Sequence, residues 1–179
     1  MITTTLNRIR KHFPCESSWV ELLESLDKTK ADDEPLSMVH ILDTLGMDDC
    51  FWAMRSLPEY DREWRLLACA CAEAVLSHFE DKYPKDDRPR KCIEVSRAFA
   101  NGEATQDEMV AARDAADAAA DAAGDAARDA ADAAADAAGD YSWYAAGDAW
   151  YEARTAGGAA GKEQESQLRK VLTETESRI

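Results

Sequence analysis

The sequence lacks any apolar run long enough to cross a membrane. Its longest run, Leu66 to Ala72, is far shorter than the ~20 apolar residues that a spanning helix needs. The alanine-rich part carries an acid on every helical turn, so it cannot cross a membrane either.

The five cysteines, at positions 15, 50, 69, 71 and 92, are odd in number and lack the spacing of a disulfide framework. No signal peptide opens the chain, so a reducing, cytoplasmic location is expected.

Residue patterns for catalysis or metal binding are also missing. The three histidines, His12, His40 and His78, form no His-x-x-x-His pair and no carboxylate arrangement of a zinc enzyme. Cys69 and Cys71 would point about 200° apart on a helix, so buried packing explains them better than a shared metal. Neither a glycine-rich phosphate loop nor a nucleophile elbow occurs. The sequence therefore predicts no metal, no cofactor and no enzymatic activity.

Sustained period-two alternation is absent, whereas apolar residues recur at helical spacing through the first hundred residues. This predicts an all-α fold. We expect a helical core domain over residues 1–103, a long Ala/Asp-rich helix over 104–156, and a C-terminal helix over 157–179. The large apolar side chains lie mainly before residue 101, so the main core is expected there.

A perfect tandem repeat occupies residues 111–140, with the same fifteen residues at 111–125 and 126–140. Each copy holds nine alanines, four aspartates, one arginine and one glycine, a composition that strongly favours helix. Asn101-Gly102 marks the end of the preceding helix, and Thr105 with Glu108 fits a capping box. An unbroken helix from Gln106 to about Arg154 would be about 70 Å long. The alternative is a hairpin, broken at one of Gly124, Gly139 or Gly147.

Aspartates recur every three or four residues along the repeat, so they share one helix face. They are Asp114, Asp117, Asp121, Asp125, Asp129, Asp132, Asp136 and Asp140. The segment from Asp107 to Glu152 contains twelve acidic residues and two arginines, so it contributes −10 to the formal net charge of −15. Such charge disfavours nucleic acid and anionic membranes as direct partners. The stripe is either a solvated face or a binding surface for a basic protein.

Two further groups of residues are candidates for binding. Aromatic residues follow the repeat as pairs seven residues apart, so they would dock this end onto another helix or anchor an interface; they are Trp143, Trp150, Tyr144 and Tyr151. Three cations, Arg88, Arg90 and Lys91, form a basic counterpart that could pair with the acidic stripe within or between chains. Their alternative interpretation is a solvated helix start.

The segment from Asp86 to Glu103, DDRPRKCIEVSRAFANGE, precedes the alanine-rich tail. Together they resemble a family of immunity proteins of bacterial toxin systems, found in bacterial and phage genomes. The stretches DDEPLS (32–37), LGMDD (45–49) and DREWRL (61–66) resemble sequences that accompany such tails, so the resemblance covers about residues 17–153. It implies a non-catalytic binding role in a bacterium or infected host cell.

Three functional classes remain open. The first is an inhibitor or immunity-type protein that binds a basic toxin, nuclease or defence-system component. The second is a phage counter-defence protein that mimics DNA. One aspartate per about 5.6 Å is sparse beside the one charge per ~1.7 Å of duplex DNA, so a single helix would need further acids. The third is a scaffold, such as a homodimer, in which the alanine faces of two helices pack together.

Overall fold

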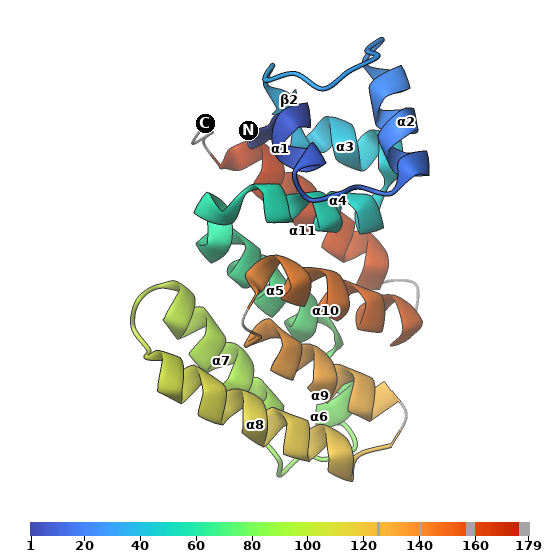
Figure 1. The fold of residues 1–179 in the computed structure, drawn as a ribbon. Helices are drawn as coiled ribbons and strands as arrows, with labels where there is room; N and C mark the ends of the chain where they lie inside the picture. Colours follow the sequence, from blue (N-terminus) through green and yellow to red (C-terminus); the bar gives the residue numbers. More distant parts are fainter. Residues whose placement is uncertain (125, 140, 157–159, 176–179) are drawn as a thin grey trace. The chain divides into compact units, whose positions relative to one another are not determined.

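The computed structural model describes residues 1–124, 126–139, 141–156 and 160–175. Over these residues the chain is essentially all-α, which confirms the predicted fold class (Figure 1). One short antiparallel sheet joins β1 (Thr3–Thr4) to β2 (Leu36–Ser37), with Thr3 opposite Ser37 and Thr4 opposite Leu36. Two-residue strands are too short to show alternation, so the sequence did not predict them.

The chain divides into two compact units. One comprises Met1–Tyr60 with Leu168–Ile179, and the other comprises Asp61–Gln167. Its boundaries differ from those expected at residues 103 and 156, because the repeat region belongs to the same compact unit as residues 61–103.

The first unit is built from short helices with clear local stop and start signals. Thr5 caps its first helix by accepting the backbone N–H of Arg8, Ser37 accepts that of Val39, and Gly46 ends another with φ +85°. These helices are α1 (Leu6–Arg10), α2 (Glu16–Ser25), α3 (Met38–Leu45), α4 (Met47–Ala53), the 3-10 turns η1 (Met54–Ser56) and η2 (Pro58–Tyr60), and the end of α11 (Ala160–Glu174).

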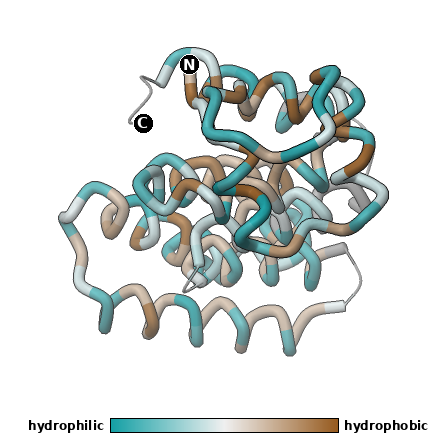
Figure 2. Tube along the Cα trace, turned by 45° about the horizontal axis from the view of Figure 1, so that its top comes forward, coloured by the Kyte–Doolittle hydropathy of each residue, from teal (hydrophilic) through white to brown (hydrophobic). Residues whose placement is uncertain are grey.

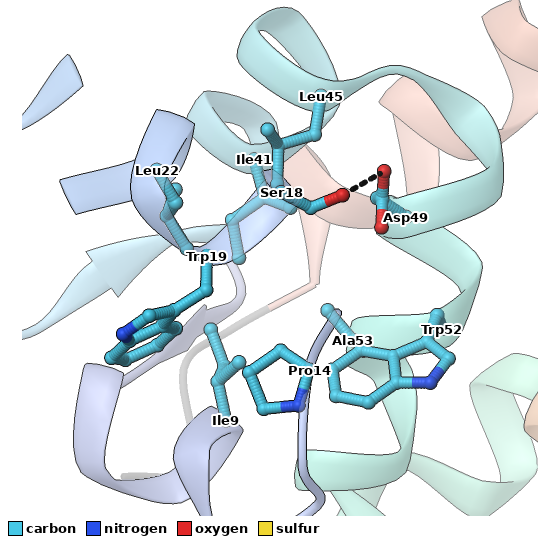
Figure 3. Close-up of a pocket in the computed structure, with 10 residues that line it drawn as sticks. All are labelled: Ile9, Pro14, Ser18, Trp19, Leu22, Ile41, Leu45, Asp49, Trp52 and Ala53. Carbon is cyan, nitrogen blue, oxygen red and sulfur yellow. Dashed lines mark hydrogen bonds between the residues drawn. The ribbon is translucent and has the colours of Figure 1, made fainter. Parts of the chain in front are cut away.

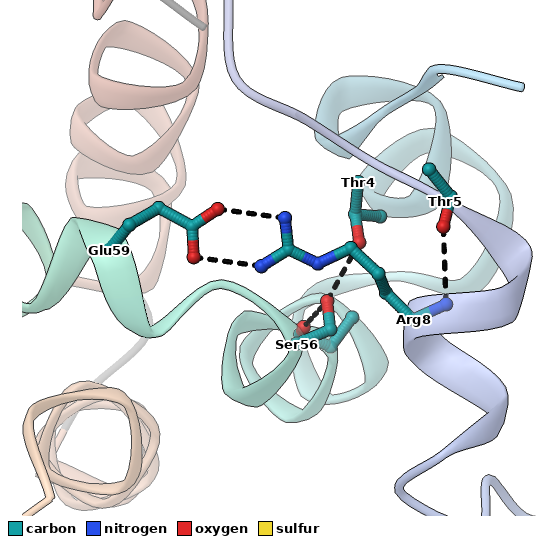
Figure 4. Close-up of polar contacts among 6 residues, drawn as sticks. Thr4, Thr5, Arg8, Ser56 and Glu59 are labelled. Carbon is teal, nitrogen blue, oxygen red and sulfur yellow. Dashed lines mark hydrogen bonds and ion pairs between the residues drawn. The ribbon is translucent and has the colours of Figure 1, made fainter. Parts of the chain in front are cut away.

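Polar contacts tie the N-terminal strand and α1 to η1 and η2 in this unit (Figure 4). The hydroxyls of Thr4 and Ser56 are 2.8 Å apart and buried. The Arg8 guanidinium donates two hydrogen bonds of 2.8 Å to the Glu59 carboxylate. Because two parallel bonds fix orientation as well as distance, they hold α1 in register with η2.

A cavity in the first unit lies among Trp19, Trp52 and Pro14, beside the Ser18–Asp49 hydrogen bond of 3.1 Å (Figure 3). Its volume is only about 20 Å³, which is room for about one water molecule. It therefore offers no space for a substrate or cofactor.

Phe13, in the turn that follows α1, adopts a conformation that large side chains avoid. Its φ is +57° and its side chain is 90% exposed, so it carries left-handed strain and buries almost nothing. Phe13→Asn should raise the free energy of unfolding by about 0.5–1 kcal/mol, because asparagine tolerates this region. Urea denaturation measures the change. Phe13→Leu keeps the strain and should give no gain; a loss of stability in Phe13→Asn would contradict the argument.

The second unit is a bundle of helices around α9 (Figure 1). Its members are α5 (Asp61–Val75), α6 (Ser77–Glu80), α7 (Arg88–Ala100), α8 (Gln106–Ala122), α9 (Ala126–Ala137) and α10 (Ser142–Ala156). The helices α8, α9 and α10 follow one another side by side, each running antiparallel to the one before it. In addition, α9 packs against α5, α6 and α7. The predicted capping box of Thr105 and Glu108 at the start of α8 is confirmed.

The expected continuous helix from Gln106 to Arg154 is wrong. The helix stops at Ala122, restarts at Ala126, stops again at Ala137 and restarts at Ser142, so the hairpin alternative holds, with two breaks. A Cβ at Gly139 would lie 2.9 Å from the Asp136 carbonyl oxygen, and the second break therefore requires glycine. Folding back lets α9 pack against α5, α6, α7, α8 and α10, which a single projecting helix could not do.

The two identical copies of the repeat have different burial. In the first copy, four alanines are buried, at positions 116, 119, 120 and 123. In the second copy, the buried alanines are at 127, 130, 131, 133, 134, 135, 137 and 138, each at most 2% exposed. Because alanine lets helix axes approach closely, the second copy fits at the centre of the bundle. The alanine face thus packs inside the chain.

Side chains of α5 and α7 satisfy the carbonyl groups at the end of α9. The guanidinium of Arg65, which is 2% exposed, donates to the carbonyl oxygens of Gly139 at 2.9 Å and Ala137 at 3.4 Å. Ser96 also donates to Ala137, and the Cys92 thiol donates to Ala134 at 3.1 Å. These carbonyls lack intrahelical donors, so the end of α9 depends on residues distant in sequence.

Candidate partner-binding surface

Folding of the repeat places its aspartates on two helices rather than one. Asp114, Asp117 and Asp121 on α8 are exposed, whereas those on α9 are half-buried. Asp125 and Asp140 lie outside the described residues. We call the six described side chains the acidic face: Asp114, Asp117, Asp121, Asp129, Asp132 and Asp136. Figure 2 shows hydrophilic positions recurring along α8, the helix at its lower edge.

The two rows of the acidic face lie close enough to interact. Burial raises the pKa of Asp132 on α9, the Arg128 cation opposes this, and the carboxylates of Asp117, Asp129 and Asp121 raise it further. Asp117 and Asp121 belong to α8, so the interaction joins the two copies of the repeat. The single stripe expected from the sequence is therefore replaced by two short rows side by side.

Two carboxylates of the acidic face, Asp117 and Asp132, reduce stability at neutral pH. Burial raises the pKa of Asp117, Arg113 opposes this, and Asp114 and Asp121 raise it. A carboxyl whose pKa is higher in the folded chain binds its proton more tightly there. Its contribution to stability is therefore present at low pH and is lost as the pH rises through the folded pKa. These charges are not explained by folding, and perturbed carboxylates of this kind are candidates for function.

The basic counterpart pairs locally. Arg88 binds Asp86 at 2.6 Å, Arg90 binds Glu80 at 2.6 Å and Lys91 binds Asp87 at 2.8 Å. The predicted pairing with the acidic stripe inside the chain is therefore replaced by ion pairs with residues 80–87. This favours the alternative interpretation of the three cations as a solvated helix start.

The four aromatic residues after the repeat separate into two groups. Trp150 is 7% exposed and Trp143 is half-buried, whereas Tyr144 and Tyr151 are 58% and 51% exposed. Ser142 accompanies the inward group, and its hydroxyl lies 2.5 Å from the Asp61 carboxylate of α5. Docking onto a neighbouring helix thus applies to Trp150, and Tyr144 and Tyr151 face outward. Tyr141, which falls outside the pairs spaced by seven residues, is 67% exposed.

Other candidate chemistry is limited. The described residues include no cluster of His, Cys, Asp and Glu that could hold a metal ion. Cys69 and Cys71 are buried, as expected of packing residues, and burial raises the pKa of Cys71 to about 12, which makes its thiol unreactive. Among the residues that the structure describes, no helix combines the length and apolar character that crossing a bilayer requires.

The second unit is an all-α bundle with an acidic face, and its sequence identifies a family. The chain belongs to the family described as Imm-5 like putative immunity protein, whose model matches residues 61–176. The protein is thus of the immunity type, a class that binds a partner protein and for which a non-enzymatic role is suggested. No curated protein and no solved structure matches the chain. The match includes the whole of the second unit.

Proposed function

We propose that this chain is a non-catalytic inhibitor that binds a basic partner protein through the acidic face of α8 and α9. The observation that supports this most directly is the pairing of the two repeat copies, which sets the carboxylates of Asp117 and Asp121 against that of Asp132. Like charges held together at a cost in stability create a concentrated negative field. A basic toxin, nuclease or defence-system component would reduce that repulsion on binding.

The distribution of charge also favours this surface over the rest of the chain. Residues 107–152 account for −10 of the formal net charge of −15. Complementary fields speed encounter and exclude wrong partners, and their effect weakens as salt screens them. An inhibitor that acts through the acidic face should therefore associate rapidly at low ionic strength and more slowly at high ionic strength.

Removing charge from α8 should weaken the complex. The triple variant Asp114→Asn, Asp117→Asn, Asp121→Asn is expected to bind the partner about tenfold more weakly at low salt, mainly through slower association. The partner is first captured from a bacterial lysate with the full chain and identified. Binding is then measured by surface plasmon resonance over a series of salt concentrations. The salt dependence should be shallower in the variant than in the parent chain.

A matched control separates the acidic face from overall charge. Glu16, Glu21 and Glu24 lie on α2 and are exposed. Changing all three to glutamine removes the same three negative charges and should alter affinity by less than about twofold. Equal weakening by both triple variants, or a complex insensitive to salt, would contradict a role for the acidic face.

DNA mimicry is the second candidate, and the paired rows favour it because they supply the additional acids that one helix lacks. DNA mimicry and toxin inhibition differ in the kind of partner. If the captured protein binds DNA and duplex DNA displaces the chain from it, the chain acts as a DNA mimic rather than as an inhibitor of a basic toxin. A captured toxin that DNA does not displace excludes mimicry.

A further inference from the structure

The outward side of α10 presents a line of side chains that the acidic face does not include. Tyr144, Asp148 and Tyr151 follow one another at intervals of four and three residues, which places them on one side of α10, and Tyr141 directly precedes this helix. We call these four side chains the tyrosine stripe. Ser142, Ala146 and Trp150 occupy the opposite, buried side, so the stripe points away from the bundle.

The tyrosine rings of the stripe are unusually accessible. They are 67%, 58% and 51% exposed for Tyr141, Tyr144 and Tyr151. Trp143 extends the aromatic surface, since its ring centroid lies 6.0 Å from that of Tyr141 and 5.6 Å from that of Tyr144. Exposed tyrosines gathered on one helix are typical of binding surfaces, where they supply contact area at low conformational cost.

Asp148 lies in the middle of the stripe and is half-buried. Among the described residues, no hydrogen bond or ion pair joins its carboxylate to another group. Burial raises the pKa of this carboxyl, because the charged form loses water without gaining a partner. A carboxylate in this state gains most from a cation brought by another molecule.

We propose that the tyrosine stripe binds arginine side chains from an arginine-rich segment of the partner protein. The inference rests on the proposed function and specifies the chemistry of the partner. A guanidinium group is planar, stacks on aromatic rings and donates two parallel hydrogen bonds to a carboxylate. The stripe offers rings at Tyr144 and Tyr151 with a carboxylate between them. An ammonium group gains less from rings arranged in this way, so lysine should be the poorer ligand.

The charge around α10 agrees with this choice of ligand. Asp136 on α9 and Asp148 on α10 belong to the region of residues 107–152 whose balance is −10, and α9 packs directly against α10. A cationic segment is therefore attracted to both surfaces, and the rings of the stripe would select arginine among cations.

Two peptides of equal charge, octaarginine and octalysine, test the proposal by calorimetric titration of the full chain. Octaarginine should bind at least about threefold more tightly than octalysine. In the double variant Tyr144→Ser, Tyr151→Ser the two affinities should become equal, with that for octalysine unchanged. Tyr83→Ser, which alters a tyrosine outside the stripe, should preserve the preference. Circular dichroism verifies that each variant folds.

Single charge changes complete the test. Asp148→Asn should reduce the preference for octaarginine, whereas Asp114→Asn on α8 should weaken both peptides alike. Equal affinity of the parent chain for both peptides overturns the arginine proposal but not the proposed binding role of the acidic face. If neither peptide binds, both the arginine proposal and the proposed role of the acidic face are overturned. A preference for octaarginine that survives the double variant overturns the proposal. A double variant that changes only the sedimentation of the chain also overturns it, because the stripe would then be a contact between copies of the chain.

Discussion

Ala133→Leu is expected to lower the free energy of unfolding by about 1–3 kcal/mol, whereas Ala118→Leu should change it by less than about 0.5 kcal/mol. Ala133 on α9 is fully buried, and Ala118 on α8 is exposed. The two alanines occupy the same place in the two copies of the repeat, so their sequence neighbours are identical. Urea denaturation followed by circular dichroism measures both changes.

The expected difference arises from packing alone. Local helix propensity changes by the same small amount at both sites, because leucine and alanine are both good helix formers. Only at Ala133 must three additional carbon atoms fit among helices that already approach closely. Equal effects at the two sites would show that the second copy does not occupy the centre of the bundle.

Arg65→Met should lower the free energy of unfolding by about 2–3 kcal/mol. Methionine keeps the apolar stem but loses the hydrogen bonds to the carbonyl oxygens of Gly139 and Ala137 and the position of the guanidinium 5.3 Å from the Phe99 ring centre. The Ala137 carbonyl keeps its hydrogen bond from Ser96, whereas the Gly139 carbonyl loses the guanidinium as its donor. Leaving a carbonyl without a donor is more costly than the lost bond itself. Thermal and urea denaturation of the full chain provide the measurement.

Another arginine on α5 supplies the control for this prediction. Arg62 is exposed and donates to Asn101 at 2.7 Å, so Arg62→Met should have an effect below about 0.5 kcal/mol. Arg65→Lys keeps the charge with a different donor geometry, so its loss of unfolding free energy should lie between those of Arg62→Met and Arg65→Met. If Arg65→Met proves as mild as Arg62→Met, the end of α9 does not depend on the buried guanidinium.

Local signals in the sequence predicted helix ends well. The Thr105–Glu108 capping box and the end of α7 at Asn101 and Gly102 are both confirmed. Each depends on side chains within four residues of the group they cap. For the same reason the all-α fold class was predictable, since the spacing of apolar residues is a local property.

Predictions that required a distant partner were weaker. Gly124, Gly139 and Gly147 were equivalent as possible breaks, yet Gly147 lies inside α10. Arg88, Arg90 and Lys91 were matched with the acidic stripe by charge, but carboxylates nearer in the chain pair with them. Among the aromatic residues, burial separates Trp150 from Tyr151 although they are adjacent. Neither burial nor pairing can be obtained from composition.

The sequence by itself determined that most of residues 111–140 are helical and that the aspartates described within each copy share a face of their own helix, because both follow from residues within one or two turns. It could not determine that one copy is central and the other peripheral, since the copies are identical letter for letter. Only the tertiary structure decided this. Burial at Ala133 and exposure at Ala118 arise from packing against α5, α6, α7 and α10, which a repeated local sequence does not encode.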